Sequence, residues 1–392
     1  MALPLSYSLR NLWRRPWRTL LTVSGIAVVV FAAVLMASLS RGVQTRVKVT
    51  GEPDNLLLIS RKGENIVFSS IEADDLNRLS SLPGVAAGAD GAALVSPEIM
   101  DMAPVAAEFN GRKYRSPMNV RGVQPVAYQV HKIVRVVEGS LPQQPSEVLV
   151  GCMSHVRLGV PVAALAVGRM VRLYNNDWTV CGRFSAGDTL VESEFWVDVA
   201  EQQASLTRRT YTMAILKMES PEKAQAALAL LSQAGSAFEK DFKGKPEPAY
   251  YVEFLASLSW IYWLTLFMAA AVTLAGVLIG VNTMYTAILN RIREIGAQRV
   301  LGFSRFDILR GLLLESLVMA LLGGVLGASA GLALNDYQFK FSQGVFRLVV
   351  DSYVMGAGVA QALLIGFVGA LIPSWKGLRL PIVDALRSER GA

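Results

Sequence analysis

The residue types that most often carry out catalysis or bind metals are few in this chain. His131 and His155 are its only histidines, and neither has a Cys, His, Asp or Glu neighbour at the spacing of metal ligands. No Gly-x-Ser-x-Gly motif for a nucleophilic serine occurs. We therefore predict no catalytic residue and no metal site, and we interpret both histidines as ordinary surface or packing residues.

Two pairs of carboxylates lie close together in the sequence. Asp74 and Asp75 fall near the start of a predicted helix, where acidic side chains are favoured by the helix dipole. Glu192 and Glu194 alternate in a way that suits the solvated face of a strand. We interpret both pairs as structural rather than as general acids or bases.

The two cysteines of the chain, Cys152 and Cys181, follow or end predicted strands. In an oxidising compartment a disulfide between them would close a loop of about thirty residues and stabilise the fold by ~3 kcal/mol. Such a bond requires Cα atoms within ~7 Å of each other, which the sequence does not reveal. A disulfide and two buried thiols therefore both remain open.

The composition indicates a membrane protein with a large polar part, because 52% of the residues are hydrophobic and only 18% are charged. A span of ~30 Å of hydrocarbon needs ~20 apolar residues in a helix. The polar block is long enough for one or two compact domains. The predicted spans are residues 19–39, 261–285, 312–334 and 354–372, and the polar block covers residues 40–260.

The formal charge of +7 is concentrated in the membrane part, because basic and acidic residues nearly balance within residues 40–260. Basic residues cluster before the first span, between the second and third, and after the fourth, which is the positive-inside pattern. We therefore predict that the termini are cytoplasmic and the polar block extracytoplasmic, with no nucleic-acid partner. The cytoplasmic segments are residues 1–18, 286–311 and 373–392, and the short outer loop is residues 335–353.

The first span could be a cleaved secretory signal, but its apolar run is longer than a typical signal core. Leu5, Leu9, Leu12 and Trp13 before it favour a short interfacial helix with an aromatic anchor. Pro16 suits the first turn of the helix that follows. We therefore favour an uncleaved first span.

The polar block shows mixed α and β patterns. The capping-box pattern from Ser69 to Glu72 predicts a short helix that ends at Pro83-Gly84, and Ser220-Pro221 predicts the start of a second helix. Between them lie short runs typical of strands, with a hairpin turn at residues 175–177. We predict an α+β domain with strands at residues 119–123, 147–151, 170–174 and 178–181.

The spans contain few polar groups. Glu315 is their only carboxylate, about one turn inside the cytoplasmic end of the third span, where it could pair with Arg310 or Arg291. We favour a local tether over a transport site, since a secondary transporter would place ionisable groups near mid-membrane. Small residues recur at helical spacing and predict close helix packing. These residues are Gly276, Gly280, Gly323, Gly327 and Gly331.

A charged segment between the second and third spans predicts a short cytoplasmic helix. Ile292, Ile295 and Leu301 form an apolar side, whereas Arg291, Arg293, Glu294, Gln298 and Arg299 are left for solvent or a partner. Gly302 suits the position after a helix C-terminus, and Ser304 opens a capping-box-like start of the next helix. A solvated basic loop would explain the arginines but not the glycine and the cap.

This segment resembles the coupling-helix signature of the MacB/FtsX family of ABC transporter permeases. The matching residues are Asn282-Thr283-Met284 followed by Arg291, Arg293, Glu294, Ile295, Gly296, Arg299, Leu301 and Gly302. Residues 9–26, Leu314-Glu315-Ser316 with the glycines after it, and the tail from Pro373 also resemble the family. The outer block is similar to its periplasmic core domain through residues 82–85 and 147–151.

The chain departs from the family pattern at three positions. Asn290 stands where the family often has Glu, Val300 where it often has Ala, and Ser374 where Ala commonly follows the tail proline. These differences concern which ATPase residues the chain would contact.

The resemblance implies a fold of four transmembrane helices, one N-terminal and three C-terminal, with a large α+β extracytoplasmic domain between the first two. It implies a homodimer or related heterodimer in the bacterial inner membrane, with two copies of an ABC ATPase. Export or extraction of a substrate would then proceed by mechanotransmission, with a periplasmic adaptor or acceptor as a further partner. The alternative is an FtsX-like protein that regulates an outer partner such as a wall hydrolase.

The phosphate-binding motif Gly-x-x-x-x-Gly-Lys-Ser/Thr is absent from the chain. We therefore expect that the chain is not itself an enzyme and binds no cofactor. ATP and magnesium would bind to a separate ATPase polypeptide.

Overall fold

The computed structural model describes residues 16–48, 50–63, 65–233, 241–257, 259–341 and 344–378. The predicted interfacial helix within residues 1–18 lies almost wholly outside them, as does the tail from residue 379. The chain divides into two compact units. The helical unit holds Met1–Gly42, Ser259–Tyr337 and Arg347–Ala392, and the sheet unit holds Val43–Leu258 and Gln338–Phe346.

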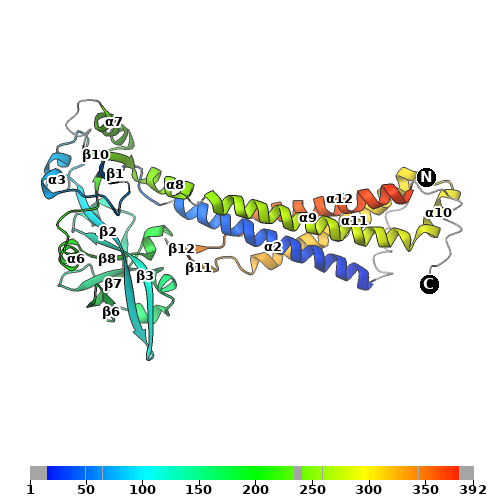
Figure 1. Ribbon diagram of the computed structural model, residues 1–392, viewed down its shortest axis with the longest axis horizontal. Helices are drawn as coiled ribbons and strands as arrows, with labels where there is room; N and C mark the ends of the chain where they lie inside the picture. The colour runs from blue at the N-terminus through cyan, green and yellow to red at the C-terminus, as the bar shows by residue number, and fades with distance from the viewer. Residues whose placement is uncertain are drawn as a thin grey trace. The chain divides into compact units, whose positions relative to one another are not determined.

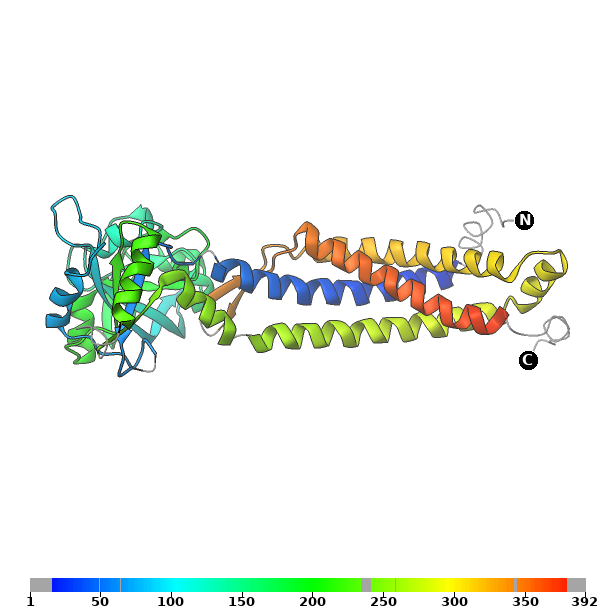
Figure 2. The same cartoon turned by 90° about the horizontal axis from the view of Figure 1, so that it is seen from above.

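The helical unit contains four helices that are long and apolar enough to cross a membrane. They run side by side in Figures 1 and 2. They include the predicted spans, except that α11 ends at Leu332, two residues before the end predicted for the third span. Each helix also continues beyond its predicted span at one or both ends, because backbone hydrogen bonding does not end where the hydrocarbon does. The four are α2 (Pro16–Lys48), α9 (Ser259–Leu289), α11 (Arg305–Leu332) and α12 (Ser352–Leu378).

Glycines bring these helices into close contact. A Cβ added to Gly327 of α11 would lie 2.4 Å from the carbonyl oxygen of Ala27 in α2. On the other side of the unit, a Cβ on Gly276 of α9 would lie 2.9 Å from the side chain of Ile365 in α12. The hydroxyl of Ser316 in α11 donates to the carbonyl oxygen of Gly366 in α12 at 2.8 Å. Small residues therefore allow the backbones to approach each other.

We expect Gly327→Val to destabilise the helical unit, because the new side chain would overlap the backbone of α2. Overpacking of this kind costs ~1 to 3 kcal/mol. Thermal unfolding of the full chain in detergent should show a lower midpoint. Gly356→Val in α12 is the matched control, because a Cβ at Gly356 would meet nothing within 4 Å. Equal midpoints for the two variants would contradict close packing at Gly327.

The sheet unit is built on one mixed sheet of ten strands in the order β10-β1-β9-β2-β3-β8-β5-β7-β4, with β6 paired to β2 and β7. The longest strands, β2 and β3, form an antiparallel hairpin, and the parallel pairs are β3 with β8 and β5 with β7. The strands are β1 (Asn55–Ser60), β2 (Val95–Phe109), β3 (Arg112–Val123), β4 (Arg135–Gly139), β5 (Glu147–Gly151), β6 (Met170–Leu173), β7 (Asn176–Ser185), β8 (Phe195–Asp198), β9 (Met213–Lys217) and β10 (Phe242–Pro246).

Apolar side chains from the strands form two main cores with the helices of this unit. One core surrounds Trp178 and Phe195 on the β2, β3, β5 and β7 part of the sheet. The other gathers α3 and α7 against β1, β9 and β10, with Leu79 and Leu231 buried in it. The helices are α3 (Ala73–Ser80), α4 (Ala127–Val130), α5 (Ser154–Leu158), α6 (Val199–Leu206), α7 (Pro221–Ser232) and α8 (Glu247–Ser257).

The helix starts follow local side-chain chemistry, with one difference from the sequence-based expectation. Ser220 caps α7 by accepting from the backbone amide of Lys223. In α3 the cap is Glu72, whose side chain accepts from the amide of Asp75 while Asp75 accepts from the amide of Glu72. The predicted Ser69 instead accepts from the amide of Ser60 in β1 at 2.9 Å. A nearby strand therefore uses the hydroxyl that we expected to cap the helix.

Residues 335–353, expected to be a plain loop, contain a two-stranded hairpin. Its strands are β11 (Gln338–Phe341) and β12 (Gly344–Arg347). Phe346 is fully buried and packs in the sheet unit with Val43, Leu190 and Tyr251. The strands are too short for periodicity to reveal them, and their partner is a core assembled from distant parts of the chain.

The structure contains Cys152 and Cys181 as free cysteines, so the disulfide that we considered is not formed. The pairing of β5 with β7 explains the separation. Gly151 lies opposite Phe184, and the backbone amide of Cys152 bonds to the carbonyl of Phe184. Cys181 is therefore about three residues away along the strand, roughly 10 Å at ~3.3 Å per residue. That exceeds the ~7 Å limit for a bridge.

Candidate coupling site and buried ionic cluster

The predicted short helix between the second and third spans is present as α10 (Ile292–Val300). After it, Gly302 adopts φ +93°, a conformation that favours glycine. Ser304 then caps α11, because its hydroxyl accepts from the amide of Asp307 at 3.1 Å. The carboxylate of Asp307 accepts in return from the amide of Ser304 at 3.2 Å. The backbone conformation of Gly302 and the cap at Ser304 turn the chain between α10 and α11.

Arg291 is buried, although we expected it to remain available to solvent or a partner. Its Nη1 donates to Glu315 Oε2 at 3.0 Å, and its Nε donates to Glu294 Oε2 at 3.1 Å. Of the two partners considered for Glu315, the structure therefore selects Arg291. The pair ties the start of α10 to α11, and it places the only carboxylate of the third span in an ion pair.

One side of α10 packs against the helical unit and the other is exposed. Ile295 and Gly296 are buried, and Ile295 belongs to a core with Met284 and Ile308. Leu301 does not join this side as expected, because it lies beyond the helix end and is 75% exposed. Arg293 is exposed, whereas Arg299 is half-buried and lies 3.5 Å from the carbonyl oxygen of Leu378 in α12.

Large apolar side chains are exposed around the end of α10. Val300 is 66% exposed and Phe306 is 71% exposed, and they lie on either side of Leu301 in the sequence. A cavity of about 270 Å³ opens beside Phe306, between α11 and α12. It is lined by Arg305, Phe306, Leu309, Trp375 and Leu378. Exposed apolar residues next to arginines are typical of a protein interface.

We expect Glu315→Leu to destabilise the helical unit more than the double variant Arg291→Met/Glu315→Leu. The single variant leaves the buried Arg291 with only the half-exposed Glu294 as its partner, and breaking a buried pair costs ~3 to 5 kcal/mol. The double variant removes both charges. Thermal unfolding of the full chain and both variants in detergent measures the difference. If the double variant unfolds first, the ion pair is not the anchor of α10.

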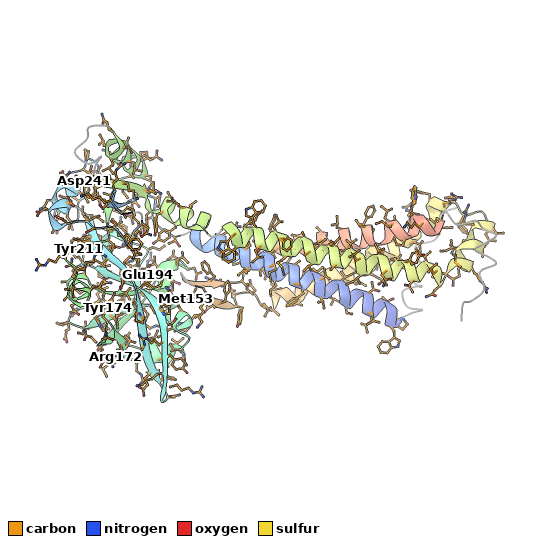
Figure 3. The ribbon with its side chains drawn as sticks, viewed as in Figure 1. Met153, Arg172, Tyr174, Glu194, Tyr211 and Asp241 are labelled. Atoms are coloured by element: carbon orange, nitrogen blue, oxygen red, sulfur yellow. The ribbon has the colours of Figure 1, made fainter. Side chains whose placement is uncertain are left out.

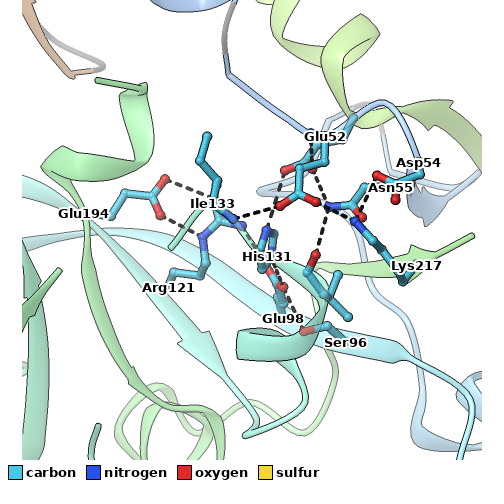
Figure 4. A network of polar contacts seen from close by, with 12 residues as sticks. Glu52, Asp54, Asn55, Ser96, Glu98, Arg121, His131, Ile133, Glu194 and Lys217 are labelled. Carbon is cyan, nitrogen blue, oxygen red and sulfur yellow. Dashed lines mark hydrogen bonds and ion pairs between the residues drawn. The ribbon is translucent and has the colours of Figure 1, made fainter. Parts of the chain in front are cut away.

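The sheet unit contains a second polar feature, a buried ionic cluster centred on Arg121 of β3 (Figure 4). Arg121 Nη1 donates to Glu98 Oε2 of β2 at 2.7 Å. Its Nε and Nη2 donate to the two carboxylate oxygens of Glu194 at 2.7 and 3.0 Å. Glu194 also accepts from the indole of Trp196 at 2.9 Å. All of these side chains are buried.

His131 continues the cluster from the end of α4. Its Nε2 lies 2.7 Å from Glu98 Oε1, and its Nδ1 lies 3.8 Å from Glu247 Oε1 at the start of α8. Burial alone would lower the pKa of His131, but the charges of Glu98 and Glu247 outweigh it and raise the pKa. Burial would likewise raise the pKa of Glu98, whereas His131 and Arg121 bring it down to about 2. The contacts between these groups therefore favour the charged form of each.

The cluster extends to the segment before β1. Glu247 Oε2 accepts from the side-chain amide of Asn55 at 2.8 Å and from the backbone amide of Glu52 at 3.0 Å. The carboxylate of Glu52 accepts from Lys217 of β9, which also donates to Asp54 at 2.9 Å. We refer to Glu52, Asp54, Asn55, Glu98, Arg121, His131, Glu194, Lys217 and Glu247 as the ionic cluster.

The ionic cluster corrects two sequence-based interpretations. His131 is a buried member of the cluster that contacts a carboxylate, rather than an ordinary surface or packing residue, whereas His155 is half-buried and contacts the carbonyl oxygen of Cys152 at 2.8 Å. Glu192 and Glu194 are buried, not solvated, and Glu192 accepts from the hydroxyl of Ser185 at 2.6 Å. One sequence signal existed: Arg121 interrupts an otherwise apolar strand end. Its partners come from β2 and from the residue before β8, which are distant in the sequence, so the sequence did not identify them.

The space around the ionic cluster is partly open. A cavity of about 170 Å³ lies beside Arg121 and Glu194, and Tyr250 and Tyr251 of α8 line it. Figure 3 labels Glu194 in the sheet unit, together with Tyr174 and with Arg172 of β6. Tyr174 forms a separate polar contact, donating to Asp101 at 3.1 Å. Among the described residues, no group of three or more His, Cys, Asp or Glu side chains is arranged to hold a metal ion.

We expect Glu98→Gln to destabilise the chain at neutral pH by ~3 to 5 kcal/mol, because it removes one partner of a buried charge. The pKa of Glu98 falls from an ordinary value of 4.5 to about 2 in the folded chain. Ionised Glu98 therefore stabilises the fold above the ordinary value, and this contribution is lost as pH falls toward about 2.

The difference in unfolding free energy between wild type and Glu98→Gln should shrink over that acid range. Denaturant unfolding of the full chain in detergent at several pH values measures it. Glu138→Gln is the control, because Glu138 is a half-exposed carboxylate paired with Arg183. A difference that stays constant with pH would show that Glu98 is not held ionised.

Comparisons with known proteins cover both units. Residues 19–234 match the family of MacB-like periplasmic core domains. Residues 266–382 match the family of FtsX-like permease C-terminal domains. The first match includes most of α2 and of the sheet unit, and the second includes α11, α12 and most of α9.

Two curated relatives illustrate the sequence similarity. The macrolide export ATP-binding/permease protein MacB of Bordetella avium is 32% identical over 123 residues, which is 31% of this chain and 19% of that protein. The uncharacterized ABC transporter permease YknZ of Bacillus subtilis is 32% identical over 108 residues, or 28% of this chain and 27% of that protein. The chain thus matches only about a fifth to a quarter of these relatives.

Two solved structures resemble part of the chain. The periplasmic region of MacB from Actinobacillus actinomycetemcomitans matches with 13% identity and a TM-score of 0.38, covering 54% of this chain and 97% of that one. The extracellular domain of YknZ from Gram-positive bacteria matches with 15% identity and a TM-score of 0.36, covering 49% and 99%.

Proposed function

Because the chain belongs to the MacB/FtsX family of ABC transporter permeases, we propose that it transmits ATP-driven motion from a separate ATPase to its sheet unit. The chain would bind no nucleotide itself. ATP and magnesium would act through the ATPase, and two permease copies, identical or related, would bind two ATPase subunits. The motion would serve export or extraction of a substrate.

The observation that best supports this proposal is the construction of α10. The buried pair of Arg291 and Glu315 joins the helix to α11, and the packing of Ile295 joins it to the core of the helical unit. At the same time, the chain after α10 leaves Val300, Leu301 and Phe306 exposed. A partner that binds these residues could therefore move the spans, because the ion pair and the packing of Ile295 attach α10 to them.

The charge pattern supports the direction of this transmission. The segment that contains α10 is rich in arginine and is favoured on the cytoplasmic side. The sheet unit would then lie outside the cytoplasm, with both termini of this sequence inside. We propose the bacterial inner membrane as the location, with a periplasmic adaptor or acceptor as a further partner.

The name of the Bordetella avium relative says that it exports macrolides and includes an ATP-binding part. In this chain the scarcity of charged groups in the spans favours handling of the substrate outside the membrane rather than through a polar pathway.

We expect Leu301→Ser to weaken ATPase binding by about tenfold or more, because it removes an exposed apolar anchor at the proposed interface. The measurement is co-purification of the ATPase with the full chain from membranes, followed by titration of the purified ATPase. Met170→Ser is the matched control, since Met170 of β6 is also a large apolar residue and is 65% exposed.

Unchanged ATPase binding in Leu301→Ser and in Arg293→Glu would contradict the coupling role. Loss of binding in Met170→Ser as well would point to a general effect of removing exposed apolar surface. An ATPase that binds normally, with an outer enzyme activated and no substrate moved, would favour the FtsX-like alternative.

A further inference from the structure

We propose that the ionic cluster is the joint through which motion of the spans enters the sheet, and that it holds only while His131 carries its proton. This inference rests on the proposed function, because it assumes that the spans deliver a force. It concerns residues of the sheet unit alone, and it assigns them a positioning role rather than a catalytic one.

The segment before β1 and the start of α8 meet at the carboxylate of Glu247. Glu52 follows the end of α2 by four residues, and Glu247 is the first residue of α8, which precedes α9 in the chain. These two segments are far apart in sequence, yet the backbone amide of Glu52 donates to Glu247 at 3.0 Å. Asn55, the first residue of β1, donates to the same carboxylate oxygen at 2.8 Å. The carboxylate of Glu247 therefore joins the chain leaving the first span to the chain entering the second.

On the side of the sheet, the carboxylate of Glu247 lies beside His131. His131 lies between Glu247 and Glu98, and Glu98 bonds to Arg121 in the neighbouring strand. Lys217 of β9 holds Glu52 on the other side of the same segment. Displacement of α8 or of the segment before β1 would therefore pull on β2, β3 and β9 through charged contacts. Such contacts are directional, unlike apolar packing.

The stability of the fold alone does not explain the ionic cluster. Replacing buried ion pairs by apolar residues of similar size is often neutral or stabilising, because burying charges is costly. The sheet unit already has extensive apolar cores beside the cluster. An arrangement of this kind is better explained by a need to hold particular segments in one position.

The dependence on His131 follows from the charges that face it. Glu98 of β2 and Glu247 of α8 are negative and lie beside the ring, and Arg121 of β3 is the positive group nearby. Arg121 is shared with Glu194, and Trp196 presents its ring to His131 at 5.4 Å between centroids. Deprotonation of His131 would remove the positive charge between Glu98 and Glu247, while Arg121 is already shared between Glu98 and Glu194. We expect α8 to loosen from the sheet in that state.

The test of the joint uses the full chain with its ATPase in lipid nanodiscs. Hydrogen exchange is measured without nucleotide and with ATP and vanadate, in wild type, Glu247→Gln and Glu253→Gln. Glu253 is the matched control, because it is a carboxylate of the same helix but is mostly exposed. We expect wild type and Glu253→Gln to show the same nucleotide-dependent change in hydrogen exchange in β2 and β3. In Glu247→Gln this change should fall by about half or more, while the change in α9 remains.

The outcomes separate the joint from the function on which it rests. An undiminished change in β2 and β3 in Glu247→Gln would overturn the joint and leave the coupling intact. No nucleotide-dependent change anywhere in wild type, despite a bound and active ATPase, would overturn the proposed function itself.

The role of the proton is tested in the full chain without nucleotide. The pKa of His131 is raised in the folded chain, so its contribution is complete below the unfolded value of about 6.5 and is lost as pH rises through the folded value. Between about pH 6 and pH 9, protection factors of α8 amides, corrected for the intrinsic effect of pH, should fall about tenfold in wild type. We expect this fall to be absent in His131→Gln and preserved in His155→Gln.

A pH response that survives in His131→Gln would overturn the dependence on His131. Loss of the pH response in His155→Gln as well would overturn the assignment of this response to the ionic cluster, because His155 is not a member of the cluster. Denaturant unfolding of each variant at pH 6 shows whether the sheet unit is still folded.

Discussion

The sheet unit depends on the charge of Arg121. A guanidinium that is buried in a sheet must be met by carboxylates, because an unpaired buried charge costs several kcal/mol. Glu98 and Glu194 meet it from β2 and from the start of β8, so three segments are held in one register. Glu98 also contacts His131, and the other ring nitrogen of His131 lies near Glu247. The arrangement of α8 against the sheet therefore follows from how one arginine is satisfied.

The helical unit obeys the same rule with fewer charges. Glu315 lies in an apolar helix, where a carboxylate is tolerated when it is paired, and Arg291 at the base of α10 supplies the partner. The helices are also held by apolar packing, by close backbone approach, as at Gly327 against α2, and by polar contacts such as the one from Ser316 to Gly366. In each unit a buried ion pair lies where a connecting segment joins the packed core. The proposed path of force uses both pairs.

Much of the fold could be predicted because its signals are local. Long apolar runs mark the four helices, and Ser220 and Ser304 cap the helices that they were expected to cap. The glycine at 302 and the charged segment before it were sufficient to predict α10. The short hairpin at residues 338–347 was missed, because four-residue strands have no periodicity to detect. The exposure of Leu301 was also missed, because it depends on where the helix ends.

The sequence by itself determined the number and order of the apolar helices, the polar domain between them and the membership in a permease family, because these depend on neighbouring residues and short motifs. Only the tertiary structure decided which charges meet. Glu52, Glu98, His131 and Glu247 are separated by long stretches of chain, and strand pairing and helix packing bring them together. Side-chain type alone made His131 an ordinary histidine. The two carboxylates that flank it in the folded chain raise its pKa and favour its charged form.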